Sequence, residues 1–76
     1  MNLRLEFLGF DTWSRRPVYV DQNERLWKDV DPRKDREPKL CTANNNAFDE
    51  EPLDPIYCLV ELRDATVTFI GGRKTW

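Results

Sequence analysis

Apolar and polar residues alternate along residues 3–8, so the chain begins with the pattern of a half-buried β-strand. Leu3, Leu5 and Phe7 fall on one face of such a strand, because successive side chains point to opposite faces. Gly9 and the polar residues that follow it end the pattern. We therefore expect a strand that buries its Leu3 face in the core.

Residues 17–30 have the pattern of a β-hairpin. Two segments, 17–20 and 25–30, are strand-like, with β-branched and aromatic residues that alternate with polar ones. Tyr19 and Trp27 fall on the same face of this hairpin, where a cross-strand aromatic contact is possible. This is the most clearly patterned element of the chain.

Residues 21–24 supply the turn of the hairpin. Asp21 and Asn23 suit a turn because their side chains bond to the nearby backbone and tolerate left-handed backbone angles. A type I turn followed by a bulge would place a left-handed residue at Glu24, where glycine is the usual choice. The sequence therefore predicts backbone strain at Glu24.

Three further segments have the length and composition of strands, at residues 39–43, 56–62 and 66–70. The run at 56–62 favours a strand over a short helix because it contains β-branched and aromatic residues, and the helix stays the alternative. Charged, asparagine-rich and proline-containing stretches between these segments predict long loops at 31–39 and 44–55.

Together these segments predict a mainly β fold, a small antiparallel sheet of about five strands, curled or barrel-like, with long loops. A chain of 76 residues is long enough for a single domain, residues 1–76. Gly71 and Gly72 end the last strand, and we expect residues 71–76 to form a mobile tail.

The amino-acid composition restricts the possible functions more than it restricts the possible folds. The chain contains no histidine and one serine, Ser14, so it lacks the side chain that most often serves as a base or a metal ligand. A serine nucleophile without histidine needs a lysine or another unusual activator, and nothing around Ser14 in the sequence supplies one. We therefore expect a protein that is not an enzyme and needs no cofactor.

Cysteines and carboxylates give little sign of a metal site. Cys41 and Cys58 lie far apart without a CxxC motif or histidine partners, so we expect two reduced, buried thiols and no metal. The spacing of the acidic group fails the EF-hand pattern and favours a solvated loop over a weak cation site. That group comprises Asp49, Glu50, Glu51 and Asp54.

Targeting signals are not evident either. No apolar run is long enough to span a membrane, and the first residues lack a signal-peptide pattern, which leads us to expect a cytoplasmic protein. The net charge of −2 argues against long-range attraction to nucleic acid or to anionic membranes.

Aromatic and cationic residues gather at the entrance to the hairpin: Trp13, Arg15, Arg16 and Tyr19. With the basic residues of the loop at 33–39 they could form a surface that stacks on bases and contacts phosphates. The acidic residues that interleave with that loop would instead pair with its cations. The plainer alternative is that Trp13 caps the core and the arginines are solvated. For Trp27, burial in the core and contact with a partner are both open.

Three segments of the chain resemble a known family: residues 5–11, 16–19 and 26–32, the last reading Leu-Trp-Lys-Asp-Val-Asp-Pro. They are similar to small uncharacterised proteins of conjugative transposons and phages of Gram-positive bacteria, and to a domain associated with large polyvalent proteins of such elements. The resemblance implies a bacterial mobile element as the source and an accessory role. It implies no catalytic residues.

Our first hypothesis is a non-enzymatic accessory protein-interaction module of a bacterial mobile genetic element. It would act as a monomer on an unidentified protein encoded by the element or its host. Trp13 and Tyr19 would be its main anchors, Trp27 a third, with Arg15 and Arg16 beside them. The alternative is a nucleic-acid-associated accessory factor that binds single strands through the same Trp and Arg surface.

Overall fold

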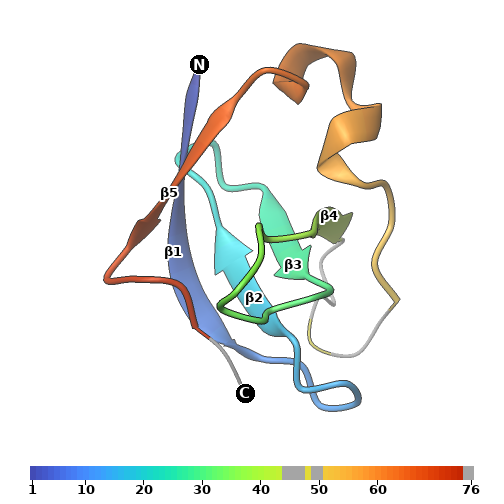
Figure 1. Ribbon diagram of the computed structural model, residues 1–76. Helices are drawn as coiled ribbons and strands as arrows, with labels where there is room; N and C mark the ends of the chain where they lie inside the picture. The colour runs from blue at the N-terminus through green and yellow to red at the C-terminus, as the bar shows by residue number, and fades with distance from the viewer. Residues whose placement is uncertain (44–47, 49–50, 75–76) are drawn as a thin grey trace.

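A computed structural model describes residues 1–43, 48 and 51–74 of the chain. In this part of the chain five strands form one sheet, and two short 3-10 helices connect the fourth strand to the fifth (Figure 1). In chain order the elements are β1 (Asn2–Phe10), β2 (Pro17–Val20), β3 (Leu26–Asp29), β4 (Leu40–Ala43), η1 (Ile56–Cys58), η2 (Val60–Leu62) and β5 (Thr66–Ile70).

The strand order is β4-β3-β2-β1-β5, so the first four strands form an antiparallel meander and the last strand joins the far edge. β5 runs parallel to β1, because the chain crosses from one edge of the sheet to the other before it enters β5. The prediction of a mainly β fold with about five strands is confirmed. The sheet is mixed, since one of its four strand pairings is parallel.

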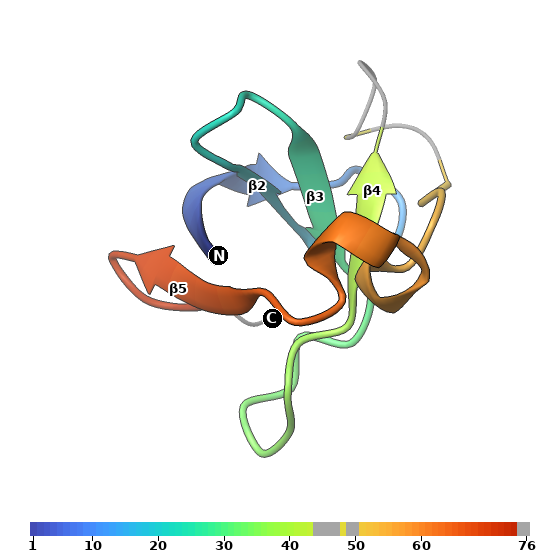
Figure 2. The ribbon, with the colours of Figure 1, turned by 90° about the horizontal axis from the view of Figure 1, so that it is seen from above.

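Curvature brings the two edges of the sheet toward one another without closing a barrel. In β1 the pairing shifts between Phe7 and Gly9, a bulge that bends the strand. Figure 2 shows β4 and β5 on opposite sides of an opening that the 3-10 segment partly covers. The expectation of a curled sheet therefore holds, whereas a closed barrel does not form.

The concave side of this sheet holds the core. Leu3, Leu5, Tyr19 and Trp27 are completely buried, and Leu40 and Leu62 join them. Tyr19 lies directly opposite Trp27 in the β2–β3 ladder, which confirms the predicted cross-strand pair. The Tyr19 ring also contacts Phe7 and Phe69, at centroid distances of 6.0 and 4.9 Å.

The hairpin turn has the predicted geometry. The N–H of Glu24 donates to the carbonyl of Asp21 at 3.1 Å, and the N–H of Asp21 donates to the carbonyl of Arg25 at 3.0 Å. Glu24 has a φ of 64°, so a glutamate occupies the left-handed bulge position that glycine usually takes. The side chain of Asp21 accepts hydrogen bonds from the N–H groups of Asn23 and Arg25 and fixes this turn.

The strand expected at residues 56–62 does not form, and this prediction is wrong. The segment folds as η1 and η2, and Ile56, Leu59 and Leu62 pack against the core from it. Leu59 has an extended backbone and joins the two short helices, and all three residues contact the same core. Tyr57 and Val60 face outward and stay exposed, so the apolar run does not indicate complete burial.

Two residues of the expected mobile tail, Arg73 and Lys74, contact the sheet and the loop at 31–39. Arg73 forms an ion pair of 2.9 Å with the fully buried Asp29, and its guanidinium donates to the carbonyls of Asp31 and Arg36. The N–H of Lys74 donates to the hydroxyl of Tyr19 at 2.9 Å. Arg73 and Lys74 of the expected tail are therefore bonded to the rest of the fold, whereas the mobility of the tail stays a prediction and residues 75–76 lie outside the described part.

The loop at 31–39 is confirmed. Of the predicted acidic group, Asp49 and Glu50 lie outside the described residues, whereas Glu51 and Asp54 are exposed. Neither of the two helices found among residues 1–43, 48 and 51–74 has the length and apolar character needed to cross a membrane.

Candidate interaction site

A single buried carboxylate organises the connection between β1 and β2, residues 11–16, which we call the Trp13 loop. The Asp11 N–H donates to the carbonyl of Arg16 at 2.9 Å and closes the loop. One oxygen of the Asp11 side chain accepts the N–H groups of Trp13, Ser14 and Arg15 at 2.9, 2.6 and 3.1 Å. Three consecutive backbone groups are thereby fixed to one anchor point.

The second carboxylate oxygen of Asp11 forms a buried ion pair with Lys28 on β3. The distance from Lys28 Nζ to Asp11 Oδ2 is 3.1 Å, and both side chains are 2% exposed. Burial raises the pKa of Asp11, but hydrogen bonds from Ser14 and Lys28 outweigh burial and lower the pKa to about 2. The carboxylate is therefore ionised at neutral pH and holds the loop to the sheet.

Ser14 is part of the same cluster. Its hydroxyl donates to Asp11 Oδ2 at 2.5 Å, and Lys28 pairs with the same oxygen. A lysine therefore lies near Ser14, which the sequence did not suggest. The hydroxyl proton is directed at a carboxylate, and the lysine is paired with that same carboxylate. The arrangement supports the loop and provides no free base to activate Ser14.

Trp13 projects from this loop into solvent. Its side chain is 84% exposed, whereas an indole is usually covered. Arg15 has a left-handed φ of 58° and is also exposed, and Arg16 is half-buried. Of the residues that the sequence assigned to an interaction surface, these three lie together on one loop, and Trp13 does not cap the core.

Tyr19 and Trp27 do not belong to that surface. Both have no exposed area, so their proposed role as exposed anchors is wrong in this structure. Their shared face of the hairpin is the concave face of the sheet, and the Trp27 indole N–H donates to Asp21 at 2.9 Å. Alternation in the sequence identified the shared face correctly but could not show which face the rest of the chain covers.

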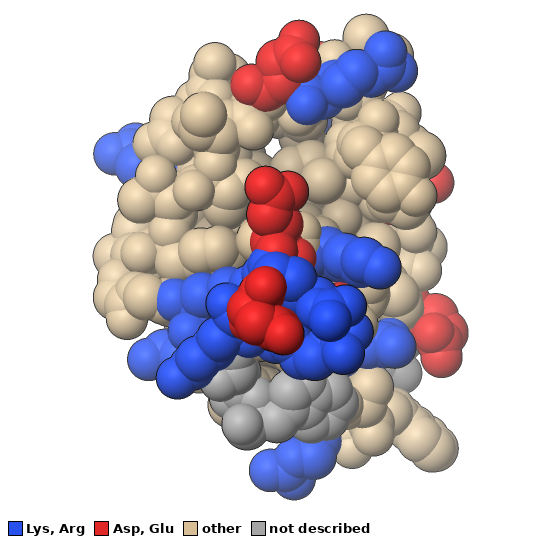
Figure 3. Space-filling view, viewed as in Figure 1, with Lys and Arg blue, Asp and Glu red and all other residues tan. Residues whose placement is uncertain are grey.

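The basic residues of the loop at 31–39 form a separate cluster. Figure 3 shows lysine and arginine gathered across the lower centre of one face of the molecule. Asp31 pairs with Arg33 at 2.8 Å and with Arg36 at 3.6 Å, and the hydrogen bond from Arg33 lowers the pKa of Asp31 to about 2. Asp35 also pairs with Arg36, at 3.4 Å, so the predicted pairing with interleaved acids is confirmed for Arg33 and Arg36.

The structure does not join this cluster to the Trp13 loop. The loop at 31–39 is tied to Arg73, whereas Trp13 shares a small pocket with Glu51 and Pro52. No residue of the 31–39 loop lines that pocket. The contacts of the described residues therefore tie the loop at 31–39 to Arg73 and not to the Trp13 loop.

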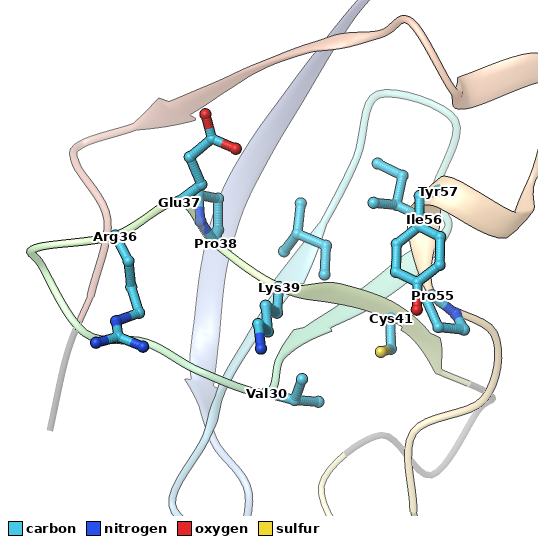
Figure 4. A pocket seen from close by; sticks show the side chains of 10 residues that line it. Val30, Arg36, Glu37, Pro38, Lys39, Cys41, Pro55, Ile56 and Tyr57 are labelled. Atoms are coloured by element: carbon cyan, nitrogen blue, oxygen red, sulfur yellow. The ribbon is translucent and has the colours of Figure 1, made fainter.

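An apolar groove, which the sequence did not reveal, lies between the 36–39 segment and η1 (Figure 4). It has a volume of about 590 Å³, and Figure 4 shows Tyr57 on the side opposite Lys39. A second hollow of about 380 Å³ shares Glu37, Pro38, Ile56 and Tyr57 with it and extends to β5. Since the walls come from segments far apart in the chain, only the exposed apolar residues of 56–60 could have indicated it.

Ligating and nucleophilic groups do not converge in the described part of the chain. No group of three or more His, Cys, Asp or Glu residues there could hold a metal ion. Both cysteines are free, with Cys41 buried and Cys58 exposed, so the expectation that both are buried is wrong for Cys58. Burial raises the pKa of the Cys41 thiol, which lowers its reactivity.

Comparison with known proteins gives no further assignment. No protein-family model, curated protein or solved structure matches this chain. The similarity to proteins of conjugative transposons and phages therefore stays a prediction.

Proposed function

We propose that this protein is a non-enzymatic interaction module that binds a partner protein through Trp13. The observation that carries the proposal is a nearly fully exposed indole on a loop whose backbone is fixed by a buried carboxylate. Exposed aromatic surface marks interaction sites, and tryptophan is among the residues enriched at binding hot spots.

The fixed backbone of the Trp13 loop favours binding. Ordering a flexible loop on association costs free energy, and the hydrogen bonds to Asp11 have already ordered this one. Burying an indole removes about 200 Å² from water, worth on the order of 5 kcal/mol before those costs. The partner would therefore offer an apolar pocket for Trp13 and a carboxylate near the exposed Arg15.

A single-stranded nucleic acid is the second candidate, because Trp13 stands beside Arg15 and Arg16 and could stack on a base while they contact phosphates. Against it, the larger basic cluster lies apart, and two of its arginines are paired with acids. In our proposal the partner is a protein encoded by a mobile element or its bacterial host.

The experiment compares Trp13→Ala with Val60→Ala. Val60 is 76% exposed but lies on η2, away from the Trp13 loop, and serves as the control. Each variant is used to capture proteins from a Gram-positive host, and the captured partner is then titrated. We expect Trp13→Ala to weaken binding by about 2 kcal/mol or more, with an unchanged melting temperature.

Two outcomes would contradict the proposal. If Trp13→Ala unfolds the protein, the indole is structural. If it leaves partner binding unchanged while binding to a labelled single-stranded oligonucleotide falls steeply with salt, the nucleic-acid candidate replaces the protein partner.

A further inference from the structure

The two edge strands of the sheet, β4 and β5, differ in whether another segment of the chain bonds to their outer side. Beyond β4 the chain returns along the outer edge, where the Thr42 N–H donates to the Asp54 carbonyl at 2.9 Å and the Leu53 N–H donates to the Thr42 carbonyl at 2.8 Å. Cys41 and Pro55 form a further bridge there. β5 pairs with β1 alone in the described part of the chain, so no described strand pairs with its outer edge.

The register shows which backbone groups of β5 point to that edge. The Thr66 N–H donates to the carbonyl of Met1, so Thr66, and with it every second residue of the strand, bonds toward β1. Val67 and Phe69 consequently direct their N–H groups outward. The Phe69 carbonyl already accepts the Gly72 N–H at 3.2 Å. The edge thus offers the N–H and carbonyl of Val67 and the N–H of Phe69.

β5 lacks the usual protection against pairing. Residues 66–70 contain neither a charge nor a proline, and four of the five are β-branched, with Phe69 as the fifth. Natural sheets normally protect a free edge with lysine, proline, a bulge or a covering segment. An unprotected edge of this composition is suited to receive another strand.

A hollow lies beside this edge on the concave side of the sheet. Val67 and Phe69 line it on one side, and Pro38, Tyr57 and Leu62 line it on the other. Figure 3 shows uncharged residues on both sides of this region, with an acidic residue between them above the basic cluster. Alternate side chains of a strand added to β5 would point into this hollow.

We propose that β5 receives an extended segment of a partner protein as a sixth strand, with alternate apolar side chains in the adjoining hollow. A second copy of this chain fits less well, because its own Val67 and Phe69 already pack against its core and cannot fill the hollow. The site is distinct from the Trp13 loop and does not depend on the function proposed for it.

The charged residues around the hollow indicate which residue types should flank the apolar positions of the bound segment. Three of the four charged residues that line the groove and the hollow are basic, and one of the three, Arg36, already pairs with Asp31 and Asp35. Lys39 and Arg63 are two of these, and neither forms an ion pair within 4.0 Å among the described residues. The segment therefore carries acidic residues on one or both sides of its apolar positions.

The test removes the outward donors without touching the β1–β5 ladder. A synthetic segment that begins at Cys58 is ligated to recombinant residues 1–57, with the backbone nitrogen of Val67 or Phe69 methylated. The same change at Thr68, whose N–H faces β1, should lower the melting temperature and verifies the assigned alternation. Methylation at Val67 or Phe69 should leave the melting temperature unchanged.

Binding is measured with peptides selected on the wild-type protein from a phage-displayed library of random peptides. We expect the enriched peptides to alternate apolar residues between acidic flanks, and methylation at Phe69 to weaken them about tenfold or more. Tyr57→Ala, which opens the wall of the hollow, and Arg63→Glu should weaken them as well. Val60→Ala, on the neighbouring turn and outside the hollow, should not.

Several outcomes would overturn the proposal. The library could yield no peptide above background, or peptides that bind wild-type and methylated proteins equally. Sedimentation could instead show a wild-type dimer that methylation at Val67 converts to a monomer, and a second copy would then occupy the edge.

Discussion

The buried ion pair between Asp11 and Lys28 gives the sharpest stability prediction, through the variant Asp11→Asn. The amide can still accept backbone N–H groups, but it removes the charge opposite a lysine that is 2% exposed. Breaking a buried pair by removing one partner typically costs about 3–5 kcal/mol. A domain of 76 residues is stable by only about 4–11 kcal/mol, so the variant should be close to unfolding.

The pH dependence follows from the pKa of Asp11, which lies at about 2 in the fold against an ordinary value of 3.8. A lowered pKa means that the native state binds fewer protons than the unfolded state. The contribution is therefore complete above a pH of about 4 and is lost as the pH falls toward about 2. Its size is on the order of 2 kcal/mol, and Asp11→Asn should lack it.

The assay is urea denaturation followed by circular dichroism at neutral and at acidic pH, with Asp11→Asn, Lys28→Met and the double variant. Lys28→Met should cost less than Asp11→Asn, because Asp11 keeps its three backbone donors. The double variant should be more stable than the sum of the single losses by about 2 kcal/mol. Wild-type stability in Asp11→Asn at neutral pH would refute the reasoning.

Two further changes test other parts of the fold. Glu24→Gly should stabilise the protein by about 0.5–1 kcal/mol in urea denaturation, because the φ of 64° favours glycine, and a loss would mean that the Glu24 side chain makes a compensating contact. Arg73→Ala should cost about 3 kcal/mol in the same assay, because it leaves the fully buried Asp29 unpaired. Arg33→Ala, at an exposed pair, should cost less than about 1 kcal/mol, and equal losses for the two arginines would contradict the role of Arg73.

Local patterns in the sequence predicted much of the sheet. Alternation located β1 and both strands of the hairpin, since a period of two is imposed by the strand itself. The turn was predictable down to the left-handed Glu24, because the spacing between the strands selects the turn type. These features depend on residues close together in the chain.

Features that depend on distant segments were not predictable. Tyr19 and Trp27 were correctly paired, but which face of the sheet is covered depends on η1 and η2. The parallel pairing of β5 depends on the crossover that precedes it. Arg73 is held by Asp29, a residue 44 positions earlier, and nothing local indicates that contact. The groove beside Tyr57 likewise combines three separate segments, residues 30, 36–41 and 55–57.

The Trp-Lys-Asp stretch at residues 27–29 takes part in fixing all three connections between β1 and β4. Three buried aspartates each accept backbone N–H groups from one of the three connections between β1 and β4. β3 takes part in all three: Trp27 donates to Asp21, Lys28 pairs with Asp11, and Asp29 is itself the third carboxylate. The pattern is therefore structural, and it stabilises a small domain whose described cysteines are both free.

The Trp13 loop differs from the other two connections because it carries an aromatic residue. The turn at 21–25 and the loop at 30–39 are fixed in the same way, yet neither carries an aromatic residue. A polar side chain at position 13 would leave the hydrogen bonds of Asp11 intact, because they involve only the backbone at that residue. Stability therefore does not explain an indole that is 84% exposed. This exposure is the reason that Trp13, rather than the buried Trp27, carries the functional proposal.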